Sequence, residues 1–199
     1  MSNPTFSVII ASHNGADRIS RVLDSCVQQS YKNFELIVVC DACDDNTEEI
    51  AKSYGAKTVV VDYHRGGLAL NAGIDIATGD WVLFIDDDDW WLHEFVFQQL
   101  ASVCLFSEDD AVFFSIIWKH VGYIQQTPNN YQRFTAGHCW RRSLIGDTRN
   151  KDWEYSFDLD FTDALLAKNP VVTFINMPMY YYNYMREGSL SDRHRKGEI

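Results

Sequence analysis

Basic residues are scarce in this sequence. Its 199 residues include 17 lysines and arginines against 28 aspartates and glutamates, which gives a formal net charge of −11 at pH 7. Proteins that bind nucleic acids or anionic membranes over a general surface need an excess of Lys and Arg. We therefore disfavour a nucleic-acid partner. The candidates for a local basic patch are Arg141-Arg142 and the run 193–196.

Long apolar runs are also missing. No stretch approaches the roughly 20 apolar residues that span a bilayer. The first residues carry no basic segment, so we expect neither a transmembrane segment nor a secretory signal. The five cysteines are odd in number and irregular in spacing, and Cys40-x-x-Cys43 has no second pair that would complete a zinc site. These absences predict a reduced, cytoplasmic protein.

Two common phosphate-binding motifs are absent as well. The sequence contains neither G-x-G-x-x-G nor G-x-x-x-x-G-K-[S/T]. A dinucleotide fingerprint and a P-loop are therefore excluded. Gly66-Gly67 opens a predicted helix and would allow a ligand to approach closely, but a glycine pair is a weak signal.

The first half of the chain alternates β-branched apolar runs with segments of helical apolar spacing. This order predicts an α/β fold with a mainly parallel sheet, right-handed crossovers and helices on both faces. In such sheets ligands bind beyond the carboxyl ends of the strands. The expected strands are 6–11, 35–40, 57–61 and 81–85, and the expected helices are 17–29, 46–54 and 68–77.

The pattern loosens in the second half, but nothing in it resembles a linker, a repeat or a low-complexity tract. The length and composition favour a single domain over residues 1–199. The expected elements are a helix over 91–103, strands over 111–118 and 121–125, a polar loop over 127–135, a helix over 152–168, a strand over 171–175 and a tyrosine-rich segment over 179–184.

Four consecutive aspartates, Asp86 to Asp89, follow the strand predicted over 81–85. Carboxylates this close raise one another's pKa and destabilise a fold. Mg²⁺ or Mn²⁺ removes this cost, because these hard cations bind carboxylate oxygens and share them with substrate phosphates. Alternate residues of an extended turn point to the same side, so Asp86 and Asp88 would face one ion or one diphosphate together. Alternatively, Asp88 or Asp89 caps the helix predicted over 91–103.

Several segments resemble family-2 glycosyltransferases of the GT-A fold. Residues 7–14 look like the family's opening strand, and residues 35–41 with Asp45-Asn46-Thr47 are similar to its second strand and aspartate loop. The stretch from Gly67 to the four aspartates matches the family's approach to its D-x-D motif. These signals follow one another in the family's order.

The resemblance implies a fold and an activity. The chain would form one GT-A domain, with residues 1 to about 90 binding a nucleotide sugar. Residues from about 91 to 199 would form the acceptor-binding half and a C-terminal lid. The activity would be an inverting, metal-dependent transfer of a sugar from a nucleoside-diphosphate sugar, with UDP favoured, to an acceptor hydroxyl. That acceptor would be a glycan, a lipid-linked molecule or a protein.

The resemblance also implies roles for individual residues. Asp41 would contact the base or ribose of the donor. Asp88 would be the main ligand of Mn²⁺ or Mg²⁺, with Asp86 as the second ligand, and the ion would stabilise the departing diphosphate. The residues implied for nucleotide-sugar binding are Ala11, Ser12, Asn14, Asp41, Asn71, Asp86, Asp87 and Arg186.

An inverting transfer also needs a base that takes the proton from the acceptor hydroxyl. Residues 150–154 are similar to the family's acidic segment at the start of a late helix, which implies Asp152 as the base. A helix start favours an ionised carboxylate, as a base requires. The alternatives are that Asp152 only caps the helix, or that the base is Glu154, Asp158 or Asp160.

The resemblance and the residue types suggest further contacts. Trp90 or Trp91 would stack on a sugar ring and help to bind the acceptor, unless both pack in the core. Arg186 lies in a segment similar to one whose basic residue reaches the diphosphate, with His194 as the alternative. Such a segment would order as a lid when the donor binds, with a solvated tail as the alternative.

The sequence is also compatible with two rival functions. A haloacid-dehalogenase-type phosphatase also uses a D-x-D after a strand, but it expects these aspartates on the first strand, and here they follow the fourth. A catalytically silent sugar-nucleotide or glycan-binding domain could share the fold. Lys151, where the family often has Glu, keeps this second rival open.

Overall fold

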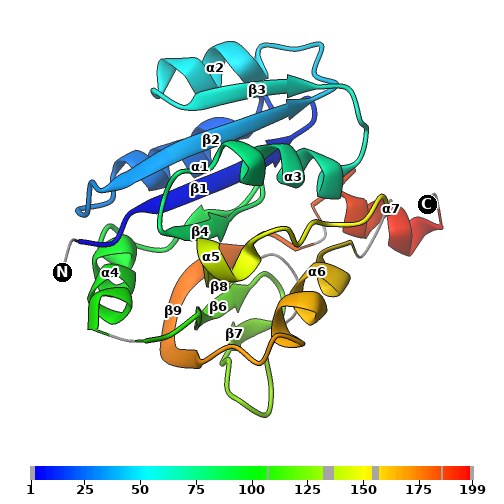
Figure 1. Ribbon diagram of the computed structural model, residues 1–199. Coiled ribbons are helices and arrows are strands. Elements are labelled where there is room, and N and C mark those ends of the chain that lie inside the picture. The colour runs from blue at the N-terminus through cyan, green and yellow to red at the C-terminus, as the bar shows by residue number, and fades with distance from the viewer. Residues whose placement is uncertain (1–2, 107, 132–136, 154–156, 185, 198–199) are drawn as a thin grey trace.

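The first half of the chain folds as the strand and helix alternation that the sequence predicts. The computed structural model describes residues 3–106, 108–131, 137–153, 157–184 and 186–197. Strands β1 and β4 are almost wholly apolar because helices cover both of their faces (Figure 1). The elements of this half are β1 (Phe6–Ser12), α1 (Ile19–Val27), β2 (Phe34–Asp41), α2 (Thr47–Ser53), β3 (Lys57–Val61), α3 (Gly66–Ile76) and β4 (Trp81–Phe84).

The second half departs from the sequence prediction in several places. The strand expected over 111–118 is confirmed as β6, but β5 and β8 were not predicted. The predicted polar loop lies partly, at 132–136, outside the described residues. The elements are β5 (Trp90–Trp91), α4 (Val96–Phe106), β6 (Ala111–Trp118), β7 (Gly122–Ile124), β8 (His138–Arg141), α5 (Arg142–Ile145), α6 (Phe157–Leu166), β9 (Val172–Tyr182) and α7 (Leu190–Lys196).

Two predicted helices begin later than expected. The helix predicted over 91–103 begins at Val96, because Trp90 and Trp91 form β5 and pair with β9. An aspartate cap on a helix starting at residue 91 is therefore wrong. The helix predicted over 152–168 is α6, which begins at Phe157. Residues 154–156, and with them Glu154, lie outside the described residues.

All the named strands belong to one sheet, in the order β3-β2-β1-β4-β8-β6-β9-β5, with β7 paired to β6. Strands β3, β2, β1 and β4 are parallel neighbours, as predicted. Strand β8 runs antiparallel to both β4 and β6, whereas β9 is parallel to β6 and antiparallel to β5. The sheet is therefore mixed, and only its first half is parallel throughout.

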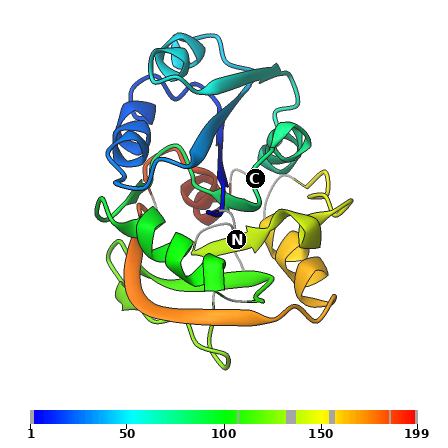
Figure 2. The ribbon, with the colours of Figure 1, turned by 60° about the vertical axis from the view of Figure 1, so that its left-hand side comes forward.

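Helices cover both faces of this sheet and bury two apolar cores. Helices α1, α2 and α4 pack on one face, and α3, α5 and α6 pack on the other (Figure 2). Burying each large apolar side chain contributes about 1.5–3 kcal/mol, so the two cores supply the main driving force for folding. None of the described helices is both long and apolar enough to cross a membrane.

Glu35 on β2 ties together the end of the sheet that lies away from the carboxyl edge. Its carboxylate accepts hydrogen bonds from Ser7 Oγ at 2.5 Å, from the Thr78 N–H at 2.7 Å and from Lys57 Nζ at 2.6 Å. These donors come from β1, β3 and the turn before β4. Burial alone would raise the pKa of Glu35, but the hydrogen bonds outweigh it and lower the pKa to about 2.

Replacing this carboxylate gives a pH-dependent loss of stability. Because the pKa of Glu35 falls from 4.5 to about 2 on folding, its charge stabilises the protein above pH 4.5, and the benefit disappears as the pH falls towards 2. We expect Glu35→Gln to lower the free energy of unfolding by about 1–2 kcal/mol at pH 7, because Lys57 is partly exposed to solvent. Urea unfolding at pH 7 and pH 3 measures this difference.

The control for this variant is Glu49→Gln, which changes an exposed glutamate on α2. We expect Glu49→Gln to change stability by less than about 0.5 kcal/mol at either pH. An equal loss of stability for Glu35→Gln at both pH values would contradict the assigned role of the charge.

Candidate active site

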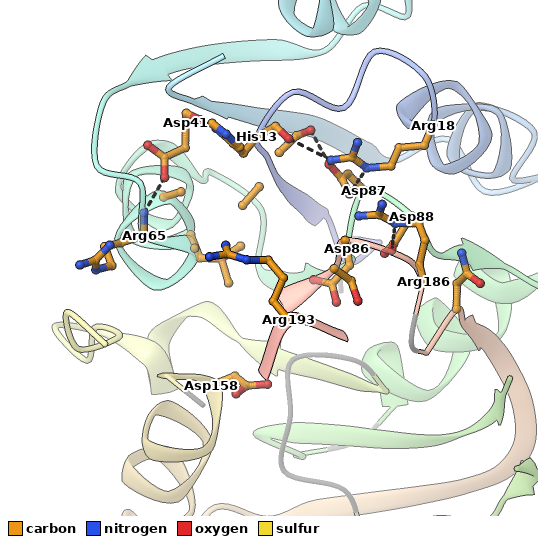
Figure 3. Close-up of a pocket in the computed structure, with 18 of the residues that line it drawn as sticks. His13, Arg18, Asp41, Arg65, Asp86, Asp87, Asp88, Asp158, Arg186 and Arg193 are labelled. Carbon is orange, nitrogen blue, oxygen red and sulfur yellow. Dashed lines mark hydrogen bonds and ion pairs between the residues drawn. The ribbon is translucent and has the colours of Figure 1, made fainter. Parts of the chain in front are cut away.

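A cavity of about 440 Å³ opens at the carboxyl edge of the parallel strands. Strands β2, β1 and β4 are parallel neighbours, so the loops that follow them leave the sheet on the same side. Helix α3, the start of α6, the segment after β9 and α7 complete the wall (Figure 3). The charged lining residues are Arg18, Asp41, Arg65, Asp86, Asp87, Asp88, Asp158, Arg186 and Arg193.

Three of the four consecutive aspartates accept hydrogen bonds from protein donors, and two of them, Asp87 and Asp89, are tied to neighbouring elements by several such bonds. Asp87 accepts hydrogen bonds from Arg18 at 2.8 and 2.9 Å. Asp89 is fully buried and accepts hydrogen bonds from the Tyr180 hydroxyl and, at 2.7 Å, from the Asn183 N–H. These two carboxylates fix the loop after β4 to the residue before α1 on one side and to the end of β9 on the other.

Asp86 and Asp88, the alternate pair, line the cavity. Burial among protein atoms raises the pKa of Asp86 to about 8, and the carboxylates of Asp88, Asp158 and Asp87 add to this effect. The Asp86 side chain is nevertheless in contact with solvent. The raised pKa therefore reflects the surrounding protein atoms and the neighbouring negative charges, and not complete exclusion from water. Burial also raises the pKa of Asp88, although Arg186 opposes it.

The carboxylates of this loop fit a divalent cation. Asp86, Asp88 and Asp89 each offer an oxygen atom, and these atoms lie within 4.8 Å of one another. Burial and the neighbouring carboxylates all raise the pKa of Asp86, which means that this position is short of positive charge. A hard cation with oxygen ligands supplies that charge. The donor set therefore suits Mg²⁺ or Mn²⁺, as the sequence predicts.

Arg186 already contacts this loop. Its Nε lies 2.6 Å from the Asp88 carboxylate, and the side chains of Arg186 and Asp88 are 30% and 13% exposed. The pair connects the segment after β9 to the loop after β4. His194, the alternative basic residue, is exposed on α7 and does not line the cavity, whereas Arg193 does.

Asp41 shapes the opposite side of the cavity. Its carboxylate accepts hydrogen bonds from the backbone N–H groups of Tyr63, His64 and Arg65 at 2.7–2.9 Å. The φ angle of His64 is 52°, a conformation that costs a non-glycine residue free energy and needs such support. Asp41 thereby brings His64 and Arg65 into the cavity wall. Its contact with a nucleotide stays a prediction.

Of the other predicted nucleotide-binding residues, some line the cavity and others hold the loops around it. Ala11 and Ser12 line the cavity, but Asn14 and Asn71 do not. The Asn14 side chain accepts a hydrogen bond from the loop after β2. The Asn71 side chain donates to the Asn150 carbonyl at 2.9 Å and accepts from the Asn150 N–H at 2.8 Å. Both asparagines hold loops in place behind the cavity.

The two tryptophans that follow the aspartates pack against protein. Trp91 is 3% exposed and makes an edge contact with Phe97 in the core. Trp90 stacks on Tyr181 with 4.0 Å between the ring centres, and the Arg21 guanidinium lies 4.8 Å from its ring. Neither tryptophan lines the cavity. Trp91 therefore packs in the core, whereas the sugar-stacking role of Trp90 stays a prediction.

Asp152, the predicted base, and Asp158, one of its alternatives, lie at different places relative to the cavity. Asp152 precedes α6 instead of starting it, its side chain is 68% exposed, and it lies 3.4 Å from Arg65 Nε, outside the cavity lining. Asp158 occupies the first turn of α6, lines the cavity, and is close enough to Asp86 to raise its pKa. Figure 3 shows Asp158 facing the cavity from the α6 side.

Residues 7–166 match the family described as glycosyl transferase family 2. The chain belongs to this family. Among curated relatives, the amylovoran biosynthesis glycosyltransferase AmsB of Erwinia amylovora is 38% identical over 135 residues, which cover 63% of this chain and 44% of AmsB. The chain spans less than half the length of AmsB and of several other curated relatives.

Solved structures of other proteins share the GT-A fold of this family member. TarS 1–349 of S. aureus, in complex with UDP-GlcNAc, gives a TM-score of 0.85 at 21% identity and covers 94% of this chain and 60% of that chain. The mannosyltransferase PcManGT of Pyrobaculum calidifontis, in complex with GDP-Man and Mn²⁺, gives a TM-score of 0.77 at 16% identity. The match covers 100% of this chain and 62% of that chain. The GT-A fold predicted from the sequence is thereby confirmed.

Sequence reasoning missed three arginines of this family member's cavity. Arg18 resembles an ordinary surface residue in the helix predicted over 17–29, and its partner Asp87 lies 69 positions away. Arg65 stands in a loop without a recognisable motif. Arg193 belongs to the basic run 193–196, which the sequence does reveal, but nothing in the sequence shows that this run approaches the aspartates.

The contact between Arg186 and Asp88 predicts competition with a metal ion. A cation bound to Asp88 competes with Arg186 for the charge of the same carboxylate, so Arg186→Gln should increase the affinity of the nucleotide-free protein for Mn²⁺. The pair is partly exposed and worth about 1 kcal/mol, which corresponds to about a fivefold gain. Electron paramagnetic resonance of free Mn²⁺ during a titration measures this affinity.

Arg195→Gln is the control for Arg186→Gln, because Arg195 pairs with Asp192 on α7 and does not line the cavity. We expect its Mn²⁺ affinity to match that of the wild type. A lower affinity in Arg186→Gln would contradict the competition.

Proposed function

We propose that this chain is a glycosyltransferase that uses a nucleoside-diphosphate sugar, with a UDP-linked donor favoured. Family membership supports the class of activity. The observation that carries the proposal is the convergence of Asp86, Asp88, Asp158 and Arg186 on one cavity. Acidic groups for a cation, a basic group for a diphosphate and a carboxylate for a proton are what such a transfer requires. The complex of TarS with UDP-GlcNAc supports the choice of UDP.

The proposed cofactor is Mn²⁺ or Mg²⁺, held by Asp88 and Asp86. Their oxygens lie close together, and the Mn²⁺ in the PcManGT complex is in keeping with this choice. When bound, such an ion acts as a Lewis acid that offsets negative charge on the departing diphosphate. Arg186 would then contribute its positive charge to the same diphosphate.

The proposed base is Asp158, and the proposed reaction inverts the anomeric centre. The acceptor oxygen forms a bond to the anomeric carbon as the bond from that carbon to the diphosphate oxygen breaks, and the acceptor proton passes to the Asp158 carboxylate. The cavity geometry supports Asp158 in preference to Asp152, because Asp158 lines the same cavity as Asp86. The acceptor would be a hydroxyl of a glycan, a lipid-linked molecule or a protein.

The rival proposal of a catalytically silent binding domain rested on Lys151. Lys151 Nζ lies 2.7 Å from the Asp160 carboxylate and 5.0 Å from the Trp153 ring, and none of these three residues lines the cavity. A lysine in that position is compatible with an intact site. We therefore favour the enzyme.

Nucleoside diphosphates provide the first test of the proposed function. Melting temperatures are measured with UDP, GDP, dTDP and ADP, each with Mn²⁺ and with a chelator. A ligand that binds only the folded state raises the melting temperature. At a hundredfold excess over its Kd, UDP with Mn²⁺ should raise it by about 5–10 °C. The chelator should reduce this shift, and no response to any of the four nucleotides would contradict the proposal.

The base is tested by comparing Asp158→Asn with Asp152→Asn. The amide of Asn cannot take a proton, so Asp158→Asn should slow the release of UDP from a UDP-sugar by about 10²–10⁴-fold. UDP affinity should remain close to that of the wild type. Asp152→Asn serves as the matched control and should retain most of the activity. The reverse result would assign the base to Asp152.

A further inference from the structure

Arg18 is unusually well covered for an arginine that stands directly before a helix. Only 19% of its side chain is exposed, and its partner Asp87 is 10% exposed. The Nε and Nη2 groups donate to the two carboxylate oxygens of Asp87 at 2.9 and 2.8 Å. This bidentate, charge-assisted geometry is the strongest form of an arginine–carboxylate contact.

The remaining donors of Arg18 hold the turn that follows β1. Its Nη1 donates to the Asn14 carbonyl at 2.7 Å and to the Asp17 carboxylate at 3.0 Å, and its Nη2 donates to the His13 carbonyl at 3.0 Å. All five N–H groups of the guanidinium therefore have acceptors. One planar group thus joins the turn after β1 to the loop after β4. A lysine cannot reproduce this geometry.

The two loops also approach each other closely through smaller residues. Ser12 Oγ donates to Asp87 at 2.5 Å. A Cβ atom on Gly15 would lie 2.2 Å from Ser12 Oγ and 2.8 Å from an oxygen of Asp87. Glycine is therefore required where the loops meet. The contact between the turn after β1 and the loop after β4, which Arg18 completes, therefore depends on a close approach of the backbone at Gly15.

We propose that Arg18 is a positioning residue that acts through Asp87. It fixes the distance between the nucleoside side of the cavity, formed by the turn after β1 and Asp41, and the phosphate side, formed by Asp86 and Asp88. This inference rests on the proposed function. A nucleoside diphosphate must contact both sides at once. If the distance between the two sides is already fixed before binding, the loops need not be ordered by the ligand, and binding is stronger. Uridine contacts only the nucleoside side, so its affinity should not depend on the distance between the two sides.

The test measures the affinities of UDP and uridine by calorimetry in the presence of Mn²⁺. Arg18→Met should weaken UDP binding by about tenfold, as the loss of a supporting contact commonly does, and should leave uridine binding within about twofold. Asp87→Asn should give the same selective loss. The double variant should be no weaker than the weaker single variant, because both changes break one connection.

Two further variants complete this experiment. Arg21→Met changes an arginine on α1 that contacts Trp90 and does not line the cavity, so its UDP affinity should equal that of the wild type. Arg18→Lys keeps a positive charge beside Asp87 but loses the fork, and it should show the selective loss of UDP binding. If Arg18→Met does not fold, Arg18→Lys can be measured in its place.

Several results would overturn this inference. If Asp87→Asn binds UDP like the wild type while Arg18→Met does not, Arg18 contacts the ligand directly. Equal losses of UDP and uridine affinity, accompanied by a lower melting temperature, would show a general structural role. Additive effects in the double variant would contradict action through Asp87. Failure of the proposed function is recognised separately, because the wild type would then bind no nucleoside diphosphate.

Discussion

The crowding of negative charge after β4 is the constraint on which the rest of the site depends. Four neighbouring carboxylates repel one another, and each can remain only if something offsets its charge. The chain offsets three of them in different ways. Asp87 has a bidentate arginine, Asp88 has a single ion pair, and Asp89 has neutral donors in the core. Burial still raises the pKa of Asp86, Asp88 and Asp89, so the loop as a whole is short of positive charge, and Asp86 and Asp88 line the cavity.

The same contacts join the two halves of the chain. Asp89 is hydrogen-bonded to Tyr180, which lies 91 positions away in the sequence, and β5 pairs with β9 directly after the aspartates. On the other face of the sheet, Asn71 holds Asn150. The cavity therefore lies where the parallel half of the sheet meets the mixed half. Residues from both halves are needed to form it.

The sequence predicted those parts of the fold that depend on local pattern. Strands β1 to β4 are apolar runs with helices between them, and their order alone placed Asp41 and the four aspartates at one edge. Strand β5 has only two residues, and β8 reads His-Cys-Trp-Arg, without the apolar run that marks β4, so both are defined by distant partners. The positions of Arg18 and Asp158 in the cavity wall likewise depend on how loops cross the edge of the sheet, which residue spacing does not encode.

The ion pairs inside the cavity suggest why acidic and basic groups stand so close together. A nucleoside diphosphate brings negative charge, and a divalent cation brings positive charge. If the cation takes Asp88 and the diphosphate takes Arg186, each partner of the existing pair gains a new partner of the opposite sign. The exchange leaves no charge unpaired in a partly buried site, where an isolated charge is costly. On the proposed function, the pair observed between Arg186 and Asp88 therefore holds both groups in the cavity until the ligands replace it.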